Sequence, residues 1–210
     1  MLLRNEVTQA SDVELLAVLL GNRKTAMSLL RKAGDSLFAL LHEVPKANGD
    51  LFCSDRSSAY AGDPIVKLRA VMELAARALA EDLKARDCLT SPSSVRDFLK
   101  HRLAGLPHEV FVCIQLDAQH RVLAIEELFR GTLTQTSVYP REVVKASLRA
   151  NAAAVIFAHN HPSGVAQPSQ ADELLTRSLK EALALVDVKV LDHFIIAGTS
   201  ALSFAARGLL

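Results

Sequence analysis

The stretch AVIFAHNHPSGVAQPSQAD, residues 154–172, decides how the second half of the chain folds. It opens with an apolar run of strand length, turns at Pro162, Ser163 and Gly164, and then starts a helix at Pro168 and Ser169. A buried strand that leads through a tight turn into a helix is a building unit of α/β folds. Polar side chains at the end of such a strand lie where functional groups gather.

The two histidines of this stretch are predicted to face one metal ion. Residues two apart on a strand share a face, so His159 and His161 project the same way, about 6–7 Å apart along the backbone. The turn and the following helix can bring Asp172 back over them. Two imidazole nitrogens and one carboxylate oxygen leave a fourth tetrahedral position open, which is typical of a catalytic zinc site. The competing interpretation is that Ser169 and Asp172 form a capping box that serves only the helix.

Strand and helix patterns alternate around this stretch. Residues 110–116 alternate like a half-buried strand, residues 117–120 fit a hairpin turn, and residues 122–129 fit a second strand. Helices are predicted from Pro140 onward and over residues 169–186, with another apolar strand over 188–196. The sequence therefore predicts an α/β fold with a mixed sheet that is covered on both faces.

The first half of the chain is predicted to be helical, with a turn-rich interruption over residues 45–62. Ser11 and Glu14 form a capping box, and Gly21 ends the helix that follows. Further helices are expected over residues 25–33, 36–41 and 64–83. Residues 84–94 look like a polar linker, so we expect a helical region at 1–88 and an α/β domain at 89–210.

Composition narrows the class of protein. The chain has 210 residues and a formal net charge of +1, which argues against a broad basic surface for nucleic acids or anionic membranes. No apolar run approaches the ~18 residues of a membrane span, and the N-terminus has no secretory pattern, so a cytoplasmic protein is expected. Its cysteines are spaced too widely for a disulfide framework or a thiolate zinc site, and each is interpreted as an apolar filler: Cys53, Cys88 and Cys113.

The decisive stretch also resembles a known motif. Read as His159-x-His161-Pro162, six residues, Ser169, two residues, Asp172, it is similar to the complete JAMM motif of MPN-domain zinc metallopeptidases. The His-Asn-His-Pro-Ser-Gly form is that of RadC-type bacterial proteins, and the resemblance runs from about residue 89 to residue 210. It implies the cytidine-deaminase-like α/β fold of MPN domains, with one zinc ion per chain held by His159, His161 and Asp172.

The resemblance also implies catalytic roles. Ser169 would help to stabilise the oxyanion, and a glutamate on an upstream strand would activate the water. Glu126 and Glu127 are both open for that role, because apolar residues occupy both faces of their strand. Position relative to Phe129 favours Glu126. His193 is interpreted as a packing residue and not as another zinc ligand.

The leading hypothesis is therefore zinc-dependent hydrolysis of a peptide or isopeptide bond in a peptide or protein substrate. A DNA-associated accessory protein and a metal-binding scaffold without turnover are the alternatives. The helical region is similar to the one that precedes RadC-type domains, which resembles a helix-hairpin-helix module that binds DNA. Residues 60–64 hold only one glycine where a Gly-rich turn is expected, so a degenerate module is predicted. Nucleobase deamination is set aside, since its H-x-E and P-C-x-x-C signature is missing.

Overall fold

A computed structural model describes residues 9–42, 63–85, 92–131 and 138–210 of the chain. The contacts between residues divide the chain into two compact units, Met1–Ala75 and Ala76–Leu210. The division falls inside helix α6 (Pro64–Ala85). The predicted domains 1–88 and 89–210 stay a prediction. Within the described ranges, no helix combines the length and the apolar character that crossing a membrane requires.

The first unit contains α2 (Asp12–Leu20), α3 (Arg23–Lys32), α4 (Leu37–His42) and the start of α6. The predicted capping box at Ser11 and Glu14 is present, and α2 ends at Gly21 in the left-handed region, where glycine is favoured. Helix α3 starts two residues earlier than predicted, because the Asn22 side chain accepts hydrogen bonds from the first free amides. The buried core of this unit consists of Leu16, Leu20, Ala26, Leu30, Leu40 and Leu68. The turn at residues 60–62, together with Cys53 and Cys88, lies outside the described residues.

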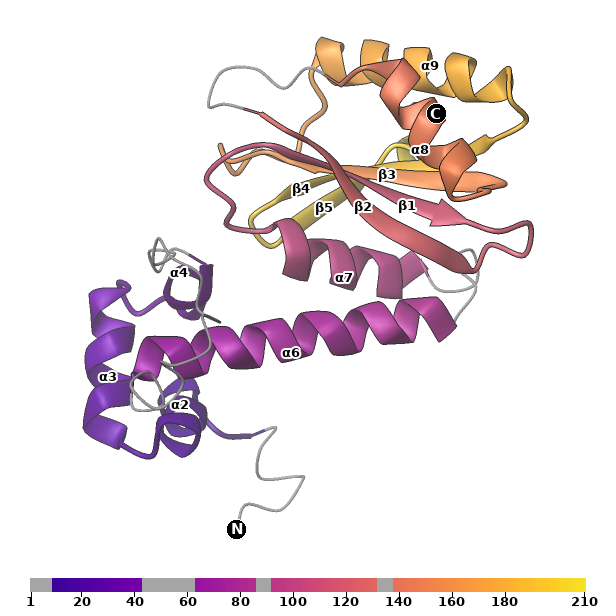
Figure 1. The fold of residues 1–210 in the computed structure, drawn as a ribbon. Helices are drawn as coiled ribbons and strands as arrows, with labels where there is room; N and C mark the ends of the chain where they lie inside the picture. Colours follow the sequence, from indigo (N-terminus) through magenta and orange to yellow (C-terminus); the bar gives the residue numbers. More distant parts are fainter. Residues whose placement is uncertain (1–8, 43–62, 86–91, 132–137) are drawn as a thin grey trace. The chain divides into compact units, whose positions relative to one another are not determined.

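The second unit is built on a five-stranded mixed sheet within the described residues (Figure 1). Its strands run in the order β2-β1-β3-β4-β5. Only β3 and β4 are parallel, and the other neighbours are antiparallel. The predicted mixed α/β sheet is confirmed, while the short β5 was not predicted. The strands are β1 (Val110–Leu116), β2 (Val122–Arg130), β3 (Ala154–Asn160), β4 (Lys189–Ala197) and β5 (Ser200–Ser203).

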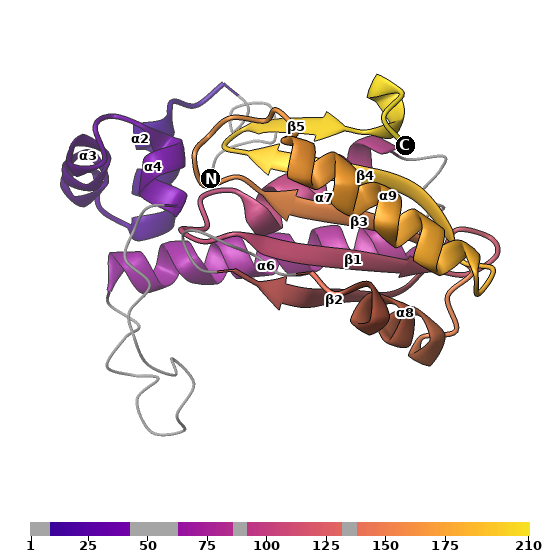
Figure 2. The same cartoon turned by 90° about the horizontal axis from the view of Figure 1, so that it is seen from above.

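Helices cover both faces of this sheet, as predicted. Helices α8 (Pro140–Arg149) and α9 (Gln170–Ala184) lie over one face, and α7 (Pro92–Leu103) lies under the other (Figures 1 and 2). Part of the linker prediction is wrong, because α6 continues to Ala85 and α7 already begins at Pro92; residues 86–91 are outside the described ranges. The core under α8 and α9 includes Phe111, Cys113, Val155, Phe157, Leu179 and Leu183.

Strand β1 differs from its prediction in burial. Its alternating pattern indicates one solvent-facing side, yet all of its residues are buried. The reason is its place between β2 and β3, with helices on both faces. The polar residues of the pattern, Cys113 and Gln115, are therefore buried as well.

The connection from β3 through α9 to the parallel strand β4 fixes where chemistry can occur. In such units the strand's carboxyl end and the helix's amino end meet at one edge of the sheet. The carboxyl end of β3 carries His159 and Asn160, and α9 opens with Ser169 as its N-cap.

Candidate metal centre

Three potential metal ligands converge at this edge of the sheet. His159 belongs to β3, His161 follows the last residue of that strand, and Asp172 lies in the first turn of α9. The Nε2 atoms of the two histidines are 3.0 Å apart. Asp172 Oδ1 lies 3.3 Å from Nε2 of His159, and Asp172 Oδ2 lies 3.5 Å from Nε2 of His161. The structure thus brings together the three residues that the spacing singled out.

The tautomer of His161 follows from its other nitrogen. His161 Nδ1 lies 2.9 Å from the carbonyl oxygen of Val165. A carbonyl oxygen only accepts, so Nδ1 carries the proton and donates it. A neutral His161 therefore presents a bare Nε2 lone pair to His159 and Asp172.

The tautomer of His159 follows from a chain of hydrogen bonds beneath it. The Thr176 hydroxyl donates to the backbone carbonyl of Asp172 at 2.6 Å, so it accepts from Nδ1 of His193 at 2.6 Å. His193 Nε2 then accepts from Nδ1 of His159 at 2.9 Å. Burial lowers the pKa of His193 well below its ordinary value, so this ring is neutral. His159 is left with a bare Nε2 lone pair as well.

Two bare nitrogen lone pairs at 3.0 Å, next to a carboxylate, require a cation between them. A proton or a metal ion would satisfy that requirement. Tetrahedral zinc with bonds of roughly 2.0–2.1 Å places its donor atoms about 3.3 Å apart. Here the two nitrogens are 3.0 Å apart, and they lie 3.3 and 3.5 Å from different oxygens of Asp172. The group could therefore hold a metal ion, and imidazole and carboxylate are donor types that zinc accepts.

The electrostatics of Asp172 and His161 also favour positive charge at this place. Burial alone would raise the pKa of Asp172, but hydrogen bonds with His159 and His161 outweigh it and hold that pKa far below its usual range. The hydrogen bond to Asp172 in turn raises the pKa of His161. The centre therefore favours an ionised carboxylate beside a bound cation.

The capping interpretation of Ser169 and Asp172 is also confirmed. The Ser169 hydroxyl accepts from the amide of Asp172, while its own backbone N–H donates to Asp172 Oδ2 at 2.7 Å. The hydroxyl itself donates to the same oxygen at 2.7 Å. The capping box thus orients the carboxylate that faces the two histidines, so the two interpretations are compatible. The oxyanion role of Ser169 stays a prediction.

His193 is buried completely and stacks on Phe204, as expected of a packing residue. Its hydrogen bond to His159 was not foreseen. Partners of this kind fix the ring orientation of a metal-binding histidine and raise its basicity. Nothing in the sequence pairs the two residues, because they are brought together only by the β3–β4 register.

The two glutamates that the sequence offered as general base lie on different faces of the sheet. Glu126 pairs across the sheet with Cys113, on the side of α8, and its carboxylate forms a 2.8 Å ion pair with Arg149. Glu127 pairs across with Val112 and binds Arg130 at 2.7 Å. No contact between either carboxylate and the three potential ligands is found in the described residues. The choice of Glu126 stays a prediction.

Glu109, which sequence reasoning did not consider, acts electrostatically on the centre. It directly precedes β1, in which Phe111 pairs with His159. The pairing of β1 with β3 ends at Phe111 and His159, and alternation along the chain places Glu109 on the same face as Phe111. Its negative charge is one of the causes that raise the pKa of His161. The alternation of residues 109, 111 and 113 was visible in the sequence, but the pairing of β1 with β3 was not.

Asn160 ties the end of β3 to the start of β1. Its Oδ1 accepts from the amide of Val110 at 2.8 Å, and its Nδ2 donates to the carbonyl oxygens of His108 and Leu106 at 3.0 and 3.5 Å. The side chain is almost completely buried. It therefore holds in place the backbone that carries the two neighbouring histidines.

We expect Asn160→Ala to lower the free energy of unfolding by about 2–3 kcal/mol, because it leaves buried backbone groups without partners. Urea unfolding of the full chain measures the change. Gln119→Ala, in the exposed hairpin turn, is the matched control and should change stability by less than about 0.5 kcal/mol. Equal effects of the two variants would contradict this role of Asn160.

Thr176→Val is expected to weaken zinc binding about 10–100-fold, because it leaves His193 without its acceptor and so loosens His159. Valine keeps the shape of the side chain, and competition with a chelator measures the affinity. Thr176→Ser restores the hydroxyl and should restore zinc binding. Unchanged affinity in the valine variant would show that the hydrogen-bond chain does not support the donors.

Comparisons with a family model and with individual proteins agree on the relatives of this chain. Residues 89–209 match the family described as RadC-like JAB domain. A UPF0758 protein of Nitrosomonas eutropha is 56% identical over 211 aligned residues, which cover 100% of this chain and 93% of that protein. UPF0758 proteins of Dechloromonas aromatica and Thiobacillus denitrificans are 56% and 53% identical. Those alignments cover 95% and 99% of this chain, and 89% and 92% of the two relatives.

Proposed function

The chain belongs to the RadC-like JAB domain family, and from this membership we propose that it is a zinc-dependent hydrolase that cleaves an amide bond of a peptide or protein. The observation that carries the proposal is the pair of bare Nε2 lone pairs, 3.0 Å apart, beside an ionised carboxylate. A cluster with only a structural role would be expected to turn one ring so that its N–H faced the other nitrogen. Here the outer hydrogen bonds fix both rings in the metal-binding tautomer.

His159, His161 and Asp172 would hold one zinc ion per chain. When bound through three protein ligands, zinc lowers the pKa of water towards about 7 and polarises a substrate carbonyl. The chain's own residues must then accept the proton of the water and stabilise the negative charge that forms on the carbonyl oxygen.

A glutamate supplies the proton acceptor in this proposal. The sequence favours Glu126, whereas Glu109 is supported by its place two residues before Phe111, the partner of His159, and by its electrostatic effect on His161. Glu126 lies level with Phe157 across two strands and is engaged by Arg149. We therefore propose Glu109 as the general base and keep Glu126 as the alternative.

Ser169 is the proposed donor to the oxyanion. Its support is the 2.7 Å hydrogen bond between its hydroxyl and Asp172, which makes it a neighbour of the proposed zinc ligands. To act, the hydroxyl would turn its proton from the carboxylate to the substrate oxygen, while the backbone N–H of Ser169 keeps Asp172 oriented.

Metal removal tests the proposal. The purified protein is expected to carry about one zinc per chain and to hydrolyse members of a peptide library. A chelator should abolish hydrolysis, and added zinc should restore it. Full zinc occupancy with no hydrolysis of any library member would favour the metal-binding scaffold. Hydrolysis that resists complete removal of the metal would contradict the proposal.

A further inference from the structure

The buried ring of His193, which supports His159, is held by contacts from the segment that follows β4. Phe204 comes directly after β5, is completely buried, and stacks on His193 with ring centroids 4.9 Å apart and an interplanar angle of 28°. The backbone N–H of Phe204 also donates to the carbonyl oxygen of His193 at 2.9 Å. Phe111 and Phe157 meet the same imidazole edge-on, at 5.6 and 5.9 Å. Of these three phenylalanine rings, Phe204 is therefore the one that lies flat against the imidazole.

Asp192 fixes the backbone on both sides of Phe204. Its Oδ2 accepts from the Ser203 hydroxyl at 2.6 Å, and its Oδ1 accepts from the backbone N–H of Ala205 at 3.0 Å. The same Oδ1 accepts from the backbone N–H of His193 at 2.7 Å. One carboxylate thus ties β4 to the residues immediately before and after the stacking ring. It therefore determines where the Phe204 ring lies relative to His193.

Phe204 also belongs to the packing that supports His161. A buried cluster that includes Phe204 packs against Ala166. Ala166 directly follows Val165, whose carbonyl oxygen accepts from Nδ1 of His161 at 2.9 Å. The two donor histidines therefore have a common support, one through a stacked imidazole and the other through a packed loop.

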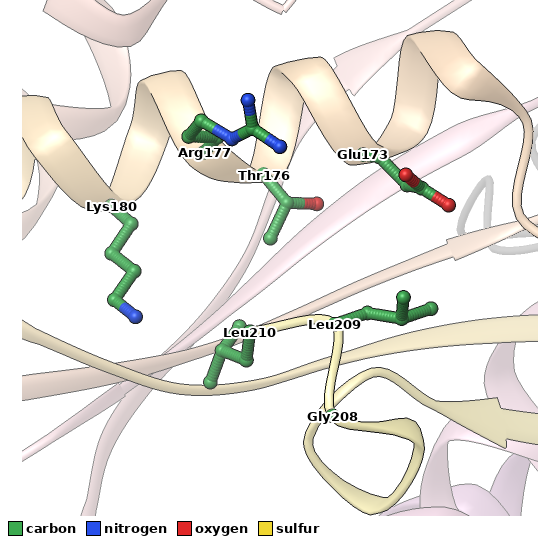
Figure 3. A pocket seen from close by; sticks show the side chains of 7 residues that line it. All are labelled: Glu173, Thr176, Arg177, Lys180, Gly208, Leu209 and Leu210. Atoms are coloured by element: carbon green, nitrogen blue, oxygen red, sulfur yellow. The ribbon is translucent and has the colours of Figure 1, made fainter.

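The residues that follow Phe204 lie close to the hydrogen-bond chain as well. Thr176, which accepts from His193, lines a cavity of about 380 Å³ together with Leu209 and Leu210, between α9 and residues 208–210 (Figure 3). Leu210 packs both against the cluster of Phe204 and against the core under α9. The segment that begins with β5 therefore contacts His193 and borders the cavity that Thr176 lines.

We propose that Phe204 is a positioning residue for the candidate metal centre and that Asp192 holds it in place. Phe204 is not one of the three potential ligands. It acts through His193 on the ring of His159, and through the loop after His161 on the second donor. This role rests on the proposed zinc site, but the orientation of the imidazoles is a property of the protein itself. It can be measured without metal, so failure of the zinc site and failure of this role are distinguishable.

Phe204→Leu is expected to weaken zinc binding about 10–100-fold, because leucine keeps the position apolar but cannot stack on the imidazole that orients His159. Competition with a chelator measures the affinity. In the metal-free full chain, in alkaline buffer that keeps the imidazoles neutral, the side-chain ¹⁵N signals of His159 and His161 should move towards those of the Nε2–H tautomer. Phe98→Leu is the matched control, since Phe98 is also buried but lies in α7, on the opposite face of the sheet. It should leave both the zinc affinity and the imidazole signals unchanged.

Asp192→Ala keeps the Phe204 ring and removes the carboxylate that holds it, so it tests the same role if Phe204→Leu does not fold. It should weaken zinc binding several-fold and shift the same imidazole signals. Asp117→Ala is its matched control, because Asp117 also accepts from two backbone amides, in the hairpin turn. It should change neither zinc binding nor the imidazole signals.

Unchanged zinc affinity and unchanged imidazole signals in Phe204→Leu and Asp192→Ala would overturn the proposal. Equal losses in the two control variants would also overturn it, because they would show that the centre responds only to overall stability. If the wild-type chain binds no zinc, the proposed function fails, whereas the imidazole signals of the metal-free variants still decide whether Phe204 positions the two histidines.

Discussion

Glu109→Gln is expected to lower the rate of peptide hydrolysis by about 10²–10⁴-fold while leaving the zinc content unchanged. Glutamine keeps the size of the side chain but cannot accept the proton of the attacking water. Glu109 is not among the three proposed ligands, so its loss should not release the metal. Steady-state hydrolysis of the best library peptide, together with elemental analysis of the same preparation, measures both quantities.

Glu126→Gln and Glu127→Gln are the matched controls for this experiment. Each removes the same charge from a carboxylate that is paired with an arginine away from the three potential ligands. Each of these two variants is expected to change the rate of peptide hydrolysis only slightly. A large loss in Glu126→Gln with an active Glu109→Gln would restore Glu126 as the general base. Full activity of all three variants would contradict a glutamate base altogether.

His161→Ala is expected to reduce zinc affinity more than about 100-fold, because it removes one of three direct ligands. Loss of a residue that only hydrogen-bonds to a ligand costs about 10–100-fold. Zinc content after dialysis should fall to the level of a metal-free control, and hydrolysis should fall with it. His161 is partly exposed, so its replacement leaves the core beneath α9 intact.

His101→Ala is the control for unspecific loss of a histidine. His101 lies in α7, on the other face of the sheet, and is not part of the candidate centre. Its replacement should leave the zinc content unchanged. Equal zinc contents in wild type, His161→Ala and His101→Ala would exclude His161 as a ligand.

Several features could be predicted because the information is local. The capping box at Ser11, the helix stop at Gly21 and the hairpin turn that follows Asp117 depend on residues within four positions of one another. The convergence of His159, His161 and Asp172 is of the same kind, since one strand, one tight turn and one helix start carry all three.

The failures concern pairings between distant segments. The burial of β1 depends on its neighbours β2 and β3. The alternation of apolar and polar side chains along one strand does not say which strands lie beside it. The choice of general base stays a prediction. Position in the sequence favours Glu126, whereas Glu109 directly precedes the strand that pairs with β3 and contributes to the raised pKa of His161.

The sequence by itself determined the helices in the described part of the first half, the mixed α/β second half and the three residues of the candidate centre. Only the tertiary structure decided which nitrogens of His159 and His161 are bare, because that depends on Thr176 and His193, which other elements supply. Local spacing fixes backbone turns and caps, but hydrogen bonds and cavities between elements depend on how those elements pack.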